Sequence, residues 1–222
     1  MASPVLPLVS VVVPVYNAER YLGEALQSVL DQQQALLELI VVDDGSSDGS
    51  RQVAARLGSA ARCVEQAHAG AAAARNHGAR LASGNYLAFL DADDQFTPGK
   101  LAAQLHALQA DRGLDMVFGH VRQFRDGTAP GQGNGTPAKL PGSLLIRRSS
   151  FDRVGAFRAE LRVGEFVDWY LRASEAGLQS RTLPRVVLER RLHDDNLGLR
   201  ERAARVDYVR ALKDSLDRRR QA

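Results

Sequence analysis

Short apolar runs alternate with helical patterns along the first two-thirds of the chain, and this alternation limits the fold more than any other feature. Residues 8–13, interrupted only by Ser10, and residues 39–42 are apolar runs rich in β-branched residues, typical of strands covered on both faces. Between them, apolar residues recur at helical spacing from Leu22 to Leu30. Strands that alternate with helices predict an α/β fold with a doubly wound, mostly parallel sheet and helices on both faces.

The same patterns place further elements along the chain. After residue 115 the alternation weakens, and residues 125–141 are rich in Gly, Pro and Thr, typical of a loop that covers a substrate. We expect further strands at residues 62–64, 86–90, 116–124, 143–146 and 186–192. We expect further helices from residues 46–48 towards Leu57, at 69–82, from Pro98 through Leu108, at 166–176 and, as an amphipathic helix, from about residue 197.

Polar residues follow three of the predicted strands at the point where each strand ends. They stand at residues 15–17, 43–45 and 91–94. In a doubly wound sheet, ligands bind beyond the carboxyl ends of the strands, so we expect these side chains to lie at one site. A polar loop is the alternative for any one of them, but a structural loop does not require three strand ends to agree.

The third of these strand ends, Asp91-Ala92-Asp93-Asp94, has the chemistry of a metal site. Side chains alternate along a strand, so Asp91 and Asp93 project to the same side. Two carboxylates held this close repel each other unless a positive charge lies between them. Mg²⁺ or Mn²⁺ suits oxygen ligands of this kind and usually brings substrate phosphates with it.

Composition excludes several classes of protein and sets an expected location. Cys63 is the single cysteine among 222 residues, so no internal disulfide forms and a reducing cytoplasm is the natural compartment. The sequence shows no secretory signal and no apolar stretch long enough to span a bilayer. A net charge of +3 is too small to argue for nucleic acid. The cluster at residues 218–220 is interpreted as a solvated helix end, with peripheral contact at the inner membrane face as the alternative.

Several motifs, in order along the chain, resemble family 2 of the glycosyltransferases, whose fold is called GT-A. The matching residues are Val11–Asn17, Ile40–Gly49, Ala74–Gly78, Ala82–Gly84 and Phe89–Asp94. Each motif is weak alone, but together they have the family's order and spacing. The resemblance is strong over residues 8–125 and loose over the remainder. It implies a Rossmann-like sheet in a single GT-A domain over 1–196, with 8–125 as the nucleotide-sugar-binding half and 126–196 as the acceptor half, followed by a C-terminal amphipathic helix at 197–222.

The resemblance also implies an activity and a donor site. A family member of this kind transfers a hexosyl or N-acetylhexosaminyl group from a nucleotide-diphosphate sugar, usually a UDP-sugar, to an acceptor hydroxyl with inversion at the anomeric carbon. By resemblance, the residues at the nucleotide are Pro14, Tyr16, Asn17, Asp43, Arg75 and Asp91. Asp43 would accept a hydrogen bond from the base, and Asp91 would lie near the ribose.

The resemblance assigns Asp91 and Asp93 to an Asp-x-Asp pair that holds the metal, Mg²⁺ or Mn²⁺, together with the diphosphate. His193 lies in a segment similar to one in the family whose His is near the metal, and it would complete the metal shell. A surface His in a polar loop is the alternative for His193. The other histidines, His68 among them, lack metal-ligand spacing and are interpreted as structural.

An inverting transfer needs a general base that takes the acceptor proton, and the family usually supplies it from a Glu-Asp pair at a helix start. The matching stretch here is Gly164–Arg172, in which Phe166 stands where the family has the catalytic Asp. Glu165 and Asp168 are three residues apart, so they share a face if this stretch is helical. Either one is a candidate base, and an ion pair with Arg172 is the alternative role for Asp168.

The departure at Phe166 leaves two alternatives to an active enzyme. The first is a catalytically weak relative that binds a sugar nucleotide without transferring it. The second is a phosphatase of the haloacid dehalogenase type, which also uses Asp-x-Asp after a strand. That motif normally lies near the chain start and is followed by Thr or Val, whereas Asp94 follows here. The acceptor stays open between a saccharide, a lipid carrier, a protein and a small molecule.

Overall fold

The Val-rich run at residues 8–13 forms strand β1 (Leu8–Val15), which lies between β2 (Leu36–Asp43) and β4 (Tyr86–Phe89) and runs parallel to both. In the computed structural model, which describes residues 8–32, 36–193 and 206–221, every β1 residue from Val9 to Val15 is buried. A strand covered on both faces has no solvent side, which explains why its sequence is apolar apart from Ser10.

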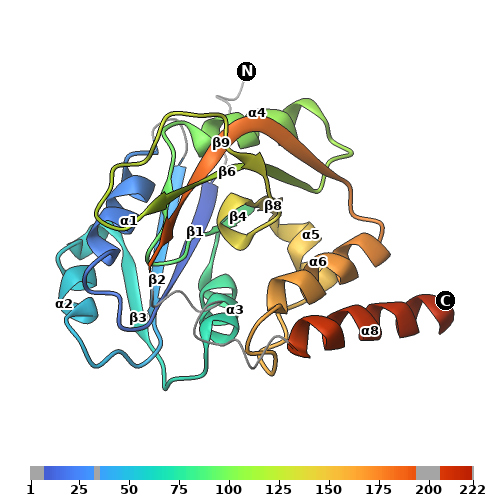
Figure 1. The fold of residues 1–222 in the computed structure, drawn as a ribbon, viewed down its shortest axis with the longest axis horizontal. Coiled ribbons are helices and arrows are strands. Elements are labelled where there is room, and N and C mark those ends of the chain that lie inside the picture. The colour runs from blue at the N-terminus through green and yellow to red at the C-terminus, as the bar shows by residue number, and fades with distance from the viewer. Residues whose placement is uncertain (1–7, 33–35, 194–205, 222) are drawn as a thin grey trace.

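β1 belongs to a nine-stranded sheet that extends through both halves of the described chain (Figure 1). The order of its strands is β3-β2-β1-β4-β8-β6-β9-β5, with β7 paired to β6. The remaining strands are β3 (Arg62–Glu65), β5 (Gln95–Phe96), β6 (Met116–Arg125), β7 (Thr136–Pro137), β8 (Leu145–Arg147) and β9 (Ser180–Leu192). The β1–β4 part is parallel, and β8 pairs antiparallel with β4 and β6, so it joins the two halves.

Helices cover both faces of the sheet and form two apolar cores. Val11 and Val13 contribute to one core, and Val12 contributes to the other, as expected for neighbours along a strand. The helices of the first core are α1 (Leu22–Leu30), α2 (Ser50–Ala55) and α4 (Lys100–Ala110). Those of the second core are α3 (Ala71–Leu81), α5 (Arg148–Val154) and α6 (Glu165–Glu175). Two short 3₁₀ turns, Gly58–Ala60 and Pro141–Ser143, complete these connections.

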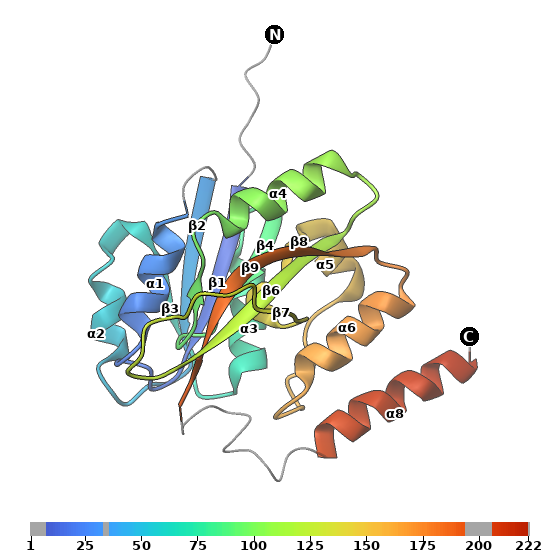
Figure 2. The ribbon, with the colours of Figure 1, turned by 45° about the horizontal axis from the view of Figure 1, so that its top comes forward.

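The C-terminal helix α8 (Val206–Gln221) lies at the edge of the molecule, alongside α6 and away from the sheet (Figures 1 and 2). Residues 197–205, where we expected this helix to begin, lie outside the described residues. Among the described helices, none has the length and apolar character that crossing a membrane requires.

Most of the expected elements are confirmed, with four differences, the first of which is the unexpected short strand β5. β9 begins at Ser180, six residues before the expected start at 186, because pairing with β6 extends it through a polar segment that contains Pro184. The expected loop at 125–141 contains the short strand β7. Helix α5 was not expected, because its seven residues are too few to show a helical period.

Candidate functional site

The three polar strand ends meet at one pocket of about 900 Å³. Its wall also includes the N-terminal parts of α3 and α6, so elements from both halves of the chain contribute. Eight predicted site residues line it: Pro14, Tyr16, Asn17, Arg75, Asp91, Asp93, Glu165 and His193. Asp43 and Asp168 do not line this pocket.

Tyr16 and His68 form an aromatic platform at one side of the pocket. Their rings stack at a centroid distance of 4.1 Å, and Tyr16 is 49% exposed although it is large and apolar. His68 was interpreted as structural from its spacing, and its stacking partner and its place in the pocket became visible only in the fold. The available signal was its position in the loop before α3, since the loops that follow strands carry the ligand site in such sheets.

Asn17 holds the end of β1 against the loop that follows β2. Its backbone has a φ of 49°, in the left-handed region that Asn tolerates better than most residues. Its side-chain oxygen accepts a hydrogen bond from Ser47 N at 2.8 Å, and its own N–H donates to Ser46 Oγ at 3.0 Å. Two of the three strand ends are therefore fixed to each other beside the platform.

The two aspartates that end β2 have different positions. Asp43 accepts a hydrogen bond from Arg51 Nε at 2.7 Å and contacts Ser46 N, so its carboxylate organises the loop behind the pocket wall. Asp44 lines the pocket and accepts hydrogen bonds from Ala69 N and Gly70 N at 2.9 and 2.8 Å. The base contact assigned to Asp43 stays a prediction, and Asp44 is the carboxylate that faces the pocket.

Arg75 of α3 connects the Asp-rich strand end to α6. Its Nη2 lies 2.6 Å from Asp91 Oδ1, and its Nη1 lies 2.7 Å from Glu165 Oε1. Burial alone would lower the pKa of the guanidinium, but the charges of Asp91 and Glu165 raise it above its ordinary value. Arg75 Nε is buried and has no hydrogen-bond partner among the described residues. A buried donor of this kind costs free energy unless a ligand satisfies it.

The carboxylates of the Asp-rich segment carry unfavourable charge. Burial, followed by the charge of Asp91, raises the pKa of Asp93, and the contact with His193 opposes this shift. Burial and the charges of Asp93 and Asp91 raise the pKa of Asp94 well above its usual range. His193 Nε2 lies 2.8 Å from Asp93 Oδ2, and its ring packs against Tyr21 at 4.9 Å.

The donor set fits a divalent cation that arrives with phosphate. Among the described residues, no three His, Cys, Asp or Glu side chains are grouped so that they could hold a metal ion by themselves. Mg²⁺ is usually bound by one or two carboxylates plus substrate phosphates rather than by a complete cage of protein ligands. Asp91 and Asp93 provide two such carboxylates at the pocket.

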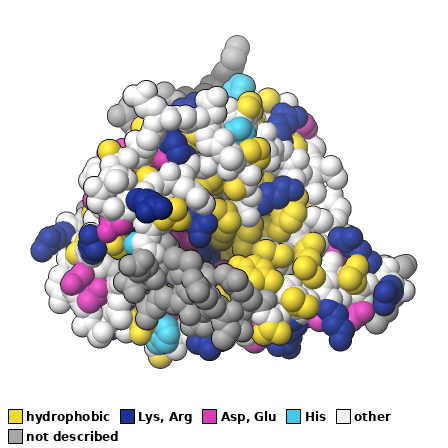
Figure 3. Space-filling view, in the orientation of Figure 1, with side chains coloured by type: hydrophobic (Ala, Val, Ile, Leu, Met, Phe, Trp, Pro, Cys, Tyr) yellow, Lys and Arg dark blue, Asp and Glu magenta, His cyan; other side chains and the backbone are white. Residues whose placement is uncertain are grey.

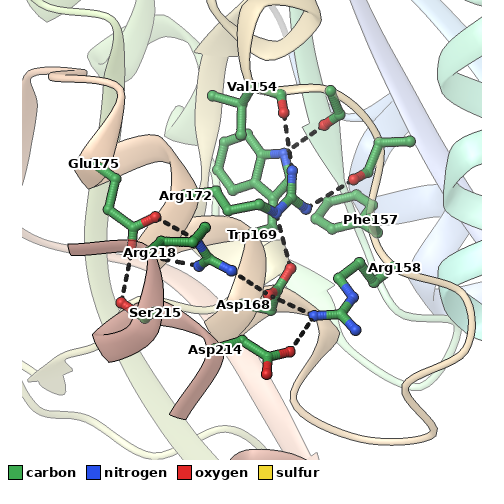
Figure 4. A network of polar contacts seen from close by, with 12 residues as sticks. Val154, Phe157, Arg158, Asp168, Trp169, Arg172, Glu175, Asp214, Ser215 and Arg218 are labelled. Atoms are coloured by element: carbon green, nitrogen blue, oxygen red, sulfur yellow. Dashed lines mark hydrogen bonds and ion pairs between the residues drawn. The ribbon is translucent and has the colours of Figure 1, made fainter. Parts of the chain in front are cut away.

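Glu165 and Asp168 are separated by the packing of α6. Glu165, the first residue of this helix, faces the pocket and Arg75. Asp168 is fully buried on another side, where Arg172 Nε approaches it at 2.9 Å and Arg158 Nη1 at 3.5 Å (Figure 4). Phe166 packs in the second apolar core beside Phe118, Phe157 and Trp169, so its position is not available to a pocket-facing acid.

Sequence comparison identifies relatives of this chain. The sequence model of Glycosyl transferase family 2 matches residues 10–162. The protein named TuaG from Bacillus subtilis (strain 168) is 39% identical over 129 residues, which cover 55% of this chain and 50% of TuaG. An uncharacterized glycosyltransferase of Haemophilus influenzae is 41% identical over 105 residues, covering 46% of this chain and 42% of the relative. The chain thus spans about half the length of these curated relatives.

Solved structures of the same shape confirm the GT-A fold. TarS of S. aureus, residues 1–349 in complex with UDP-GlcNAc, has a TM-score of 0.73 at 20% identity, covering 90% of this chain and 66% of that structure. The mannosyltransferase PcManGT of Pyrobaculum calidifontis, in complex with GDP-Man and Mn²⁺, has a TM-score of 0.72 at 20% identity, covering 99% and 66%. With the family match extending over most of the chain, these likenesses lead to one conclusion: the chain belongs to family 2 of the glycosyl transferases.

Proposed function

We propose that this chain transfers a sugar from a nucleoside diphosphate donor to an acceptor hydroxyl, with inversion at the anomeric carbon. The observation that carries the proposal is the position of Arg75, which joins the Asp-x-Asp carboxylate Asp91 to Glu165 inside one pocket. An inverting transfer needs a cationic environment for the leaving diphosphate and a carboxylate for the attacking hydroxyl. Arg75 brings these two requirements together, and its unpaired Nε is a further donor for a phosphate oxygen.

The nucleotide end of the donor fits the platform side of the pocket. A flat base can stack on the exposed Tyr16 ring, which His68 supports from its other side. Asp44 lies nearby in the wall, where its buried carboxylate accepts hydrogen bonds from Gln66, Ala69 and Gly70 and so fixes the loop that carries His68. The two structural neighbours bind UDP-GlcNAc and GDP-Man, and we propose UDP as the nucleotide here.

Asp91 and Asp93 would hold Mg²⁺ or Mn²⁺ together with the donor diphosphate. When bound, such an ion neutralises the charge that develops on the departing diphosphate. The chain's own residues orient these ligands: Arg75 fixes Asp91, and His193 fixes Asp93. Because metal binding would also relieve the repulsion between the two carboxylates, we expect metal and diphosphate to bind cooperatively.

Glu165 is proposed as the general base. Its carboxylate lies at the pocket, and its position at the start of α6 places it where the helix dipole stabilises negative charge. Deprotonation of the acceptor hydroxyl by Glu165 would produce the nucleophile that attacks the anomeric carbon opposite the diphosphate. Asp168 is the less favoured candidate for this step, because it is buried and does not line the pocket.

Calorimetry with UDP, with and without Mn²⁺, tests the donor site on the wild type and on Asp93→Ala. We expect Mn²⁺ to strengthen UDP binding at least about tenfold, as a charge-assisted diphosphate contact of about 1.5–3 kcal/mol implies, and we expect Asp93→Ala to lose this gain. A UDP affinity that changes neither with Mn²⁺ nor with Asp93→Ala would reject the metal assignment. GDP and dTDP are the parallel ligands that separate a different base preference from a non-binding site.

The buried Phe166 favours a second candidate function, a sugar-nucleotide-binding relative with little transfer. Release of UDP from UDP-sugars, with water or an added acceptor, distinguishes the two. Turnover that Glu165→Gln abolishes supports the transferase. Tight UDP binding without turnover across donors and acceptors supports the binding protein.

A further inference from the structure

Helix α8 exposes its apolar face to solvent. Val209, Leu212 and Leu216 follow one another at intervals of three and four residues, so they form one stripe. They are 64%, 51% and 54% exposed. Figure 3 shows hydrophobic side chains interspersed with Lys and Arg side chains in the region of α8. A surface helix ordinarily buries such a stripe against its own protein, whereas α8 turns its apolar stripe to the outside.

The face that α8 turns towards the body is largely polar, although it also includes the buried Ala211 and the ring of Tyr208. Asp214 lies 2.6 Å from Arg158, and Arg218 Nε lies 2.6 Å from Glu175 (Figure 4). Ser215 is also buried there, where it donates a hydrogen bond to Glu175. Hydrogen bonds and ion pairs therefore hold α8 on α6, and they leave the apolar stripe outside.

Positive charge borders the exposed stripe. The helix carries five cations and three carboxylates. Two of the carboxylates are engaged on the inner side, since Asp214 pairs with Arg158 and Asp207 accepts a hydrogen bond from Arg162 N at 3.0 Å. Arg210, Lys213, Arg219 and Arg220 are exposed. Of these, Lys213, Arg219 and Arg220 lie three or four residues from members of the apolar stripe and therefore border it.

We propose that the outward face of α8 docks on the surface of an anionic phospholipid bilayer. An apolar stripe bordered by Lys and Arg is the pattern of a helix that lies in the plane of a membrane interface, with its apolar side chains at the acyl boundary. The cations then meet lipid phosphates, each strengthening binding about fivefold. A second copy of this chain fits less well, because a symmetric contact through this face would oppose like charges.

Docking through α8 would place the bilayer beside the catalytic pocket. The ring of Tyr208 packs against Gly164, the residue before Glu165. Asp207 contacts Arg162, which lines the pocket. Given the proposed function, an acceptor carried on a lipid would reach Glu165 from this side, whereas the docking itself does not depend on any transfer activity.

Vesicle sedimentation of the full 222-residue chain, without donor or acceptor, tests the docking. We expect binding to phosphatidylcholine vesicles that contain phosphatidylglycerol, weak binding to phosphatidylcholine alone, and loss of binding as salt is added. The variant Lys213→Glu/Arg219→Glu/Arg220→Glu should bind at least about a hundredfold more weakly, as three cations at about fivefold each imply. Arg56→Glu/Arg62→Glu/Arg112→Glu is the matched control, because it changes the net charge equally at exposed positions outside α8 and should retain binding.

A second variant tests the apolar stripe. Leu212→Ser/Leu216→Ser should also lose vesicle binding while its thermal unfolding stays close to that of the wild type, since both side chains are exposed. Equal binding to neutral and anionic vesicles, or equal loss in the control triple variant, would overturn the proposal. A second result would also overturn the proposal: no vesicle binding, together with a dimer in light scattering that dissociates in the Leu212→Ser/Leu216→Ser variant. That result would assign the face to a second copy of the chain.

Discussion

Glu165 and Asp168 are three residues apart in α6, yet they face different surroundings. Glu165 meets Arg75 at the pocket, whereas Asp168 is enclosed by arginines on the side that faces α8. Their spacing alone predicted a shared face, and this was an incomplete description of a helix whose two sides pack against different partners. Because their surroundings differ, the two residues can be tested separately, Glu165 for a role in turnover and Asp168 for a role in stability.

We therefore predict opposite effects from two conservative substitutions. Glu165→Gln should lower turnover by about 10²–10⁴-fold, the usual contribution of a general base, and change stability by less than about 1 kcal/mol. Asp168→Asn should cost about 2 kcal/mol of unfolding free energy, because it removes a buried charge from arginines that are themselves only partly buried, and the remaining folded protein should turn over normally.

Turnover per folded molecule and urea unfolding of both variants measure the two effects. Each variant is the other's control, since the substitutions remove one charge from the same helix. Loss of turnover at unchanged stability in Asp168→Asn would move the base assignment to Asp168.

At the scale of single elements, α3 is a helix of small residues because it lies very close to β1. A Cβ built on Gly78 would stand 2.3 Å from Val12 Cγ1, so this position has no room for a methyl group. The Ala-rich sequence, which looks featureless as a pattern, is what brings Arg75 from the same helix to the ends of the strands. Packing at Gly78 and the position of Arg75 are therefore linked.

Gly78→Ala should destabilise the protein by about 1–3 kcal/mol, as overpacking in a dense core does. Gly23→Ala is the matched control on α1, where the new Cβ would meet Val53 Cγ1 at 3.9 Å. Ala has the better helix propensity, so the control should gain about 0.5–1 kcal/mol. Urea unfolding of both variants gives the two signs, and a stabilised Gly78→Ala would show that the approach to β1 is not close in solution.

Elements with strong local patterns were predicted well, and elements defined by pairing were not. β1 and β2 are recognisable from the sequence because the buried part of each strand is covered on both faces and is rich in apolar, β-branched residues. The first half of β9 contains Pro184 and polar residues, and only its partner β6, far away in sequence, makes it a strand. Strands of two residues such as β5 and β7 have no period at all.

At the scale of the whole molecule, the sequence predicted the part of the site that lies at the strand ends. It did not predict the part that depends on how the two halves of the chain pack together. The ends of β1, β2 and β4 must meet at one edge, so a shared site for the three polar strand ends could be predicted from the sheet, whereas the nucleotide residues were named from the family resemblance. The position of Asp43 behind the pocket wall, the stacking of His68 on Tyr16, and the separation of Glu165 from Asp168 depend on how loops and helices pack. None of these is encoded in a spacing.

A buried polar cluster connects the same two halves on the other side of the sheet. Lys100 Nζ lies 2.7 Å from Gln104 Oε1 and 3.3 Å from Leu144 O. Gln104 Nε2 in turn donates to Val117 O and Ser143 O. Burial lowers the pKa of the Lys100 ammonium from 10.5 to about 7. The cluster thus provides hydrogen-bond donors to backbone carbonyls where the two halves meet. In return it encloses the Lys100 ammonium, whose charge is costly to bury.

This cost makes the stability of the protein depend on pH in a direction that can be stated. Below pH 7, Lys100 is protonated in both the folded and the unfolded chain, so the full penalty of the buried ammonium is present. Between the folded pKa of about 7 and the ordinary value of 10.5, the unfolded chain binds the proton that the folded chain has lost, so stability rises with pH.

Lys100→Met removes this titration. It should therefore be more stable than the wild type by about 2–4 kcal/mol below pH 7, allowing for the unsatisfied Gln104 oxygen, with the difference shrinking as the pH approaches 10.5. Urea unfolding across this pH range measures the difference in unfolding free energy. Lys100→Arg serves as the control that keeps the charge. A stability difference between Lys100→Met and the wild type that does not change with pH would show that the buried amine is not the group responsible.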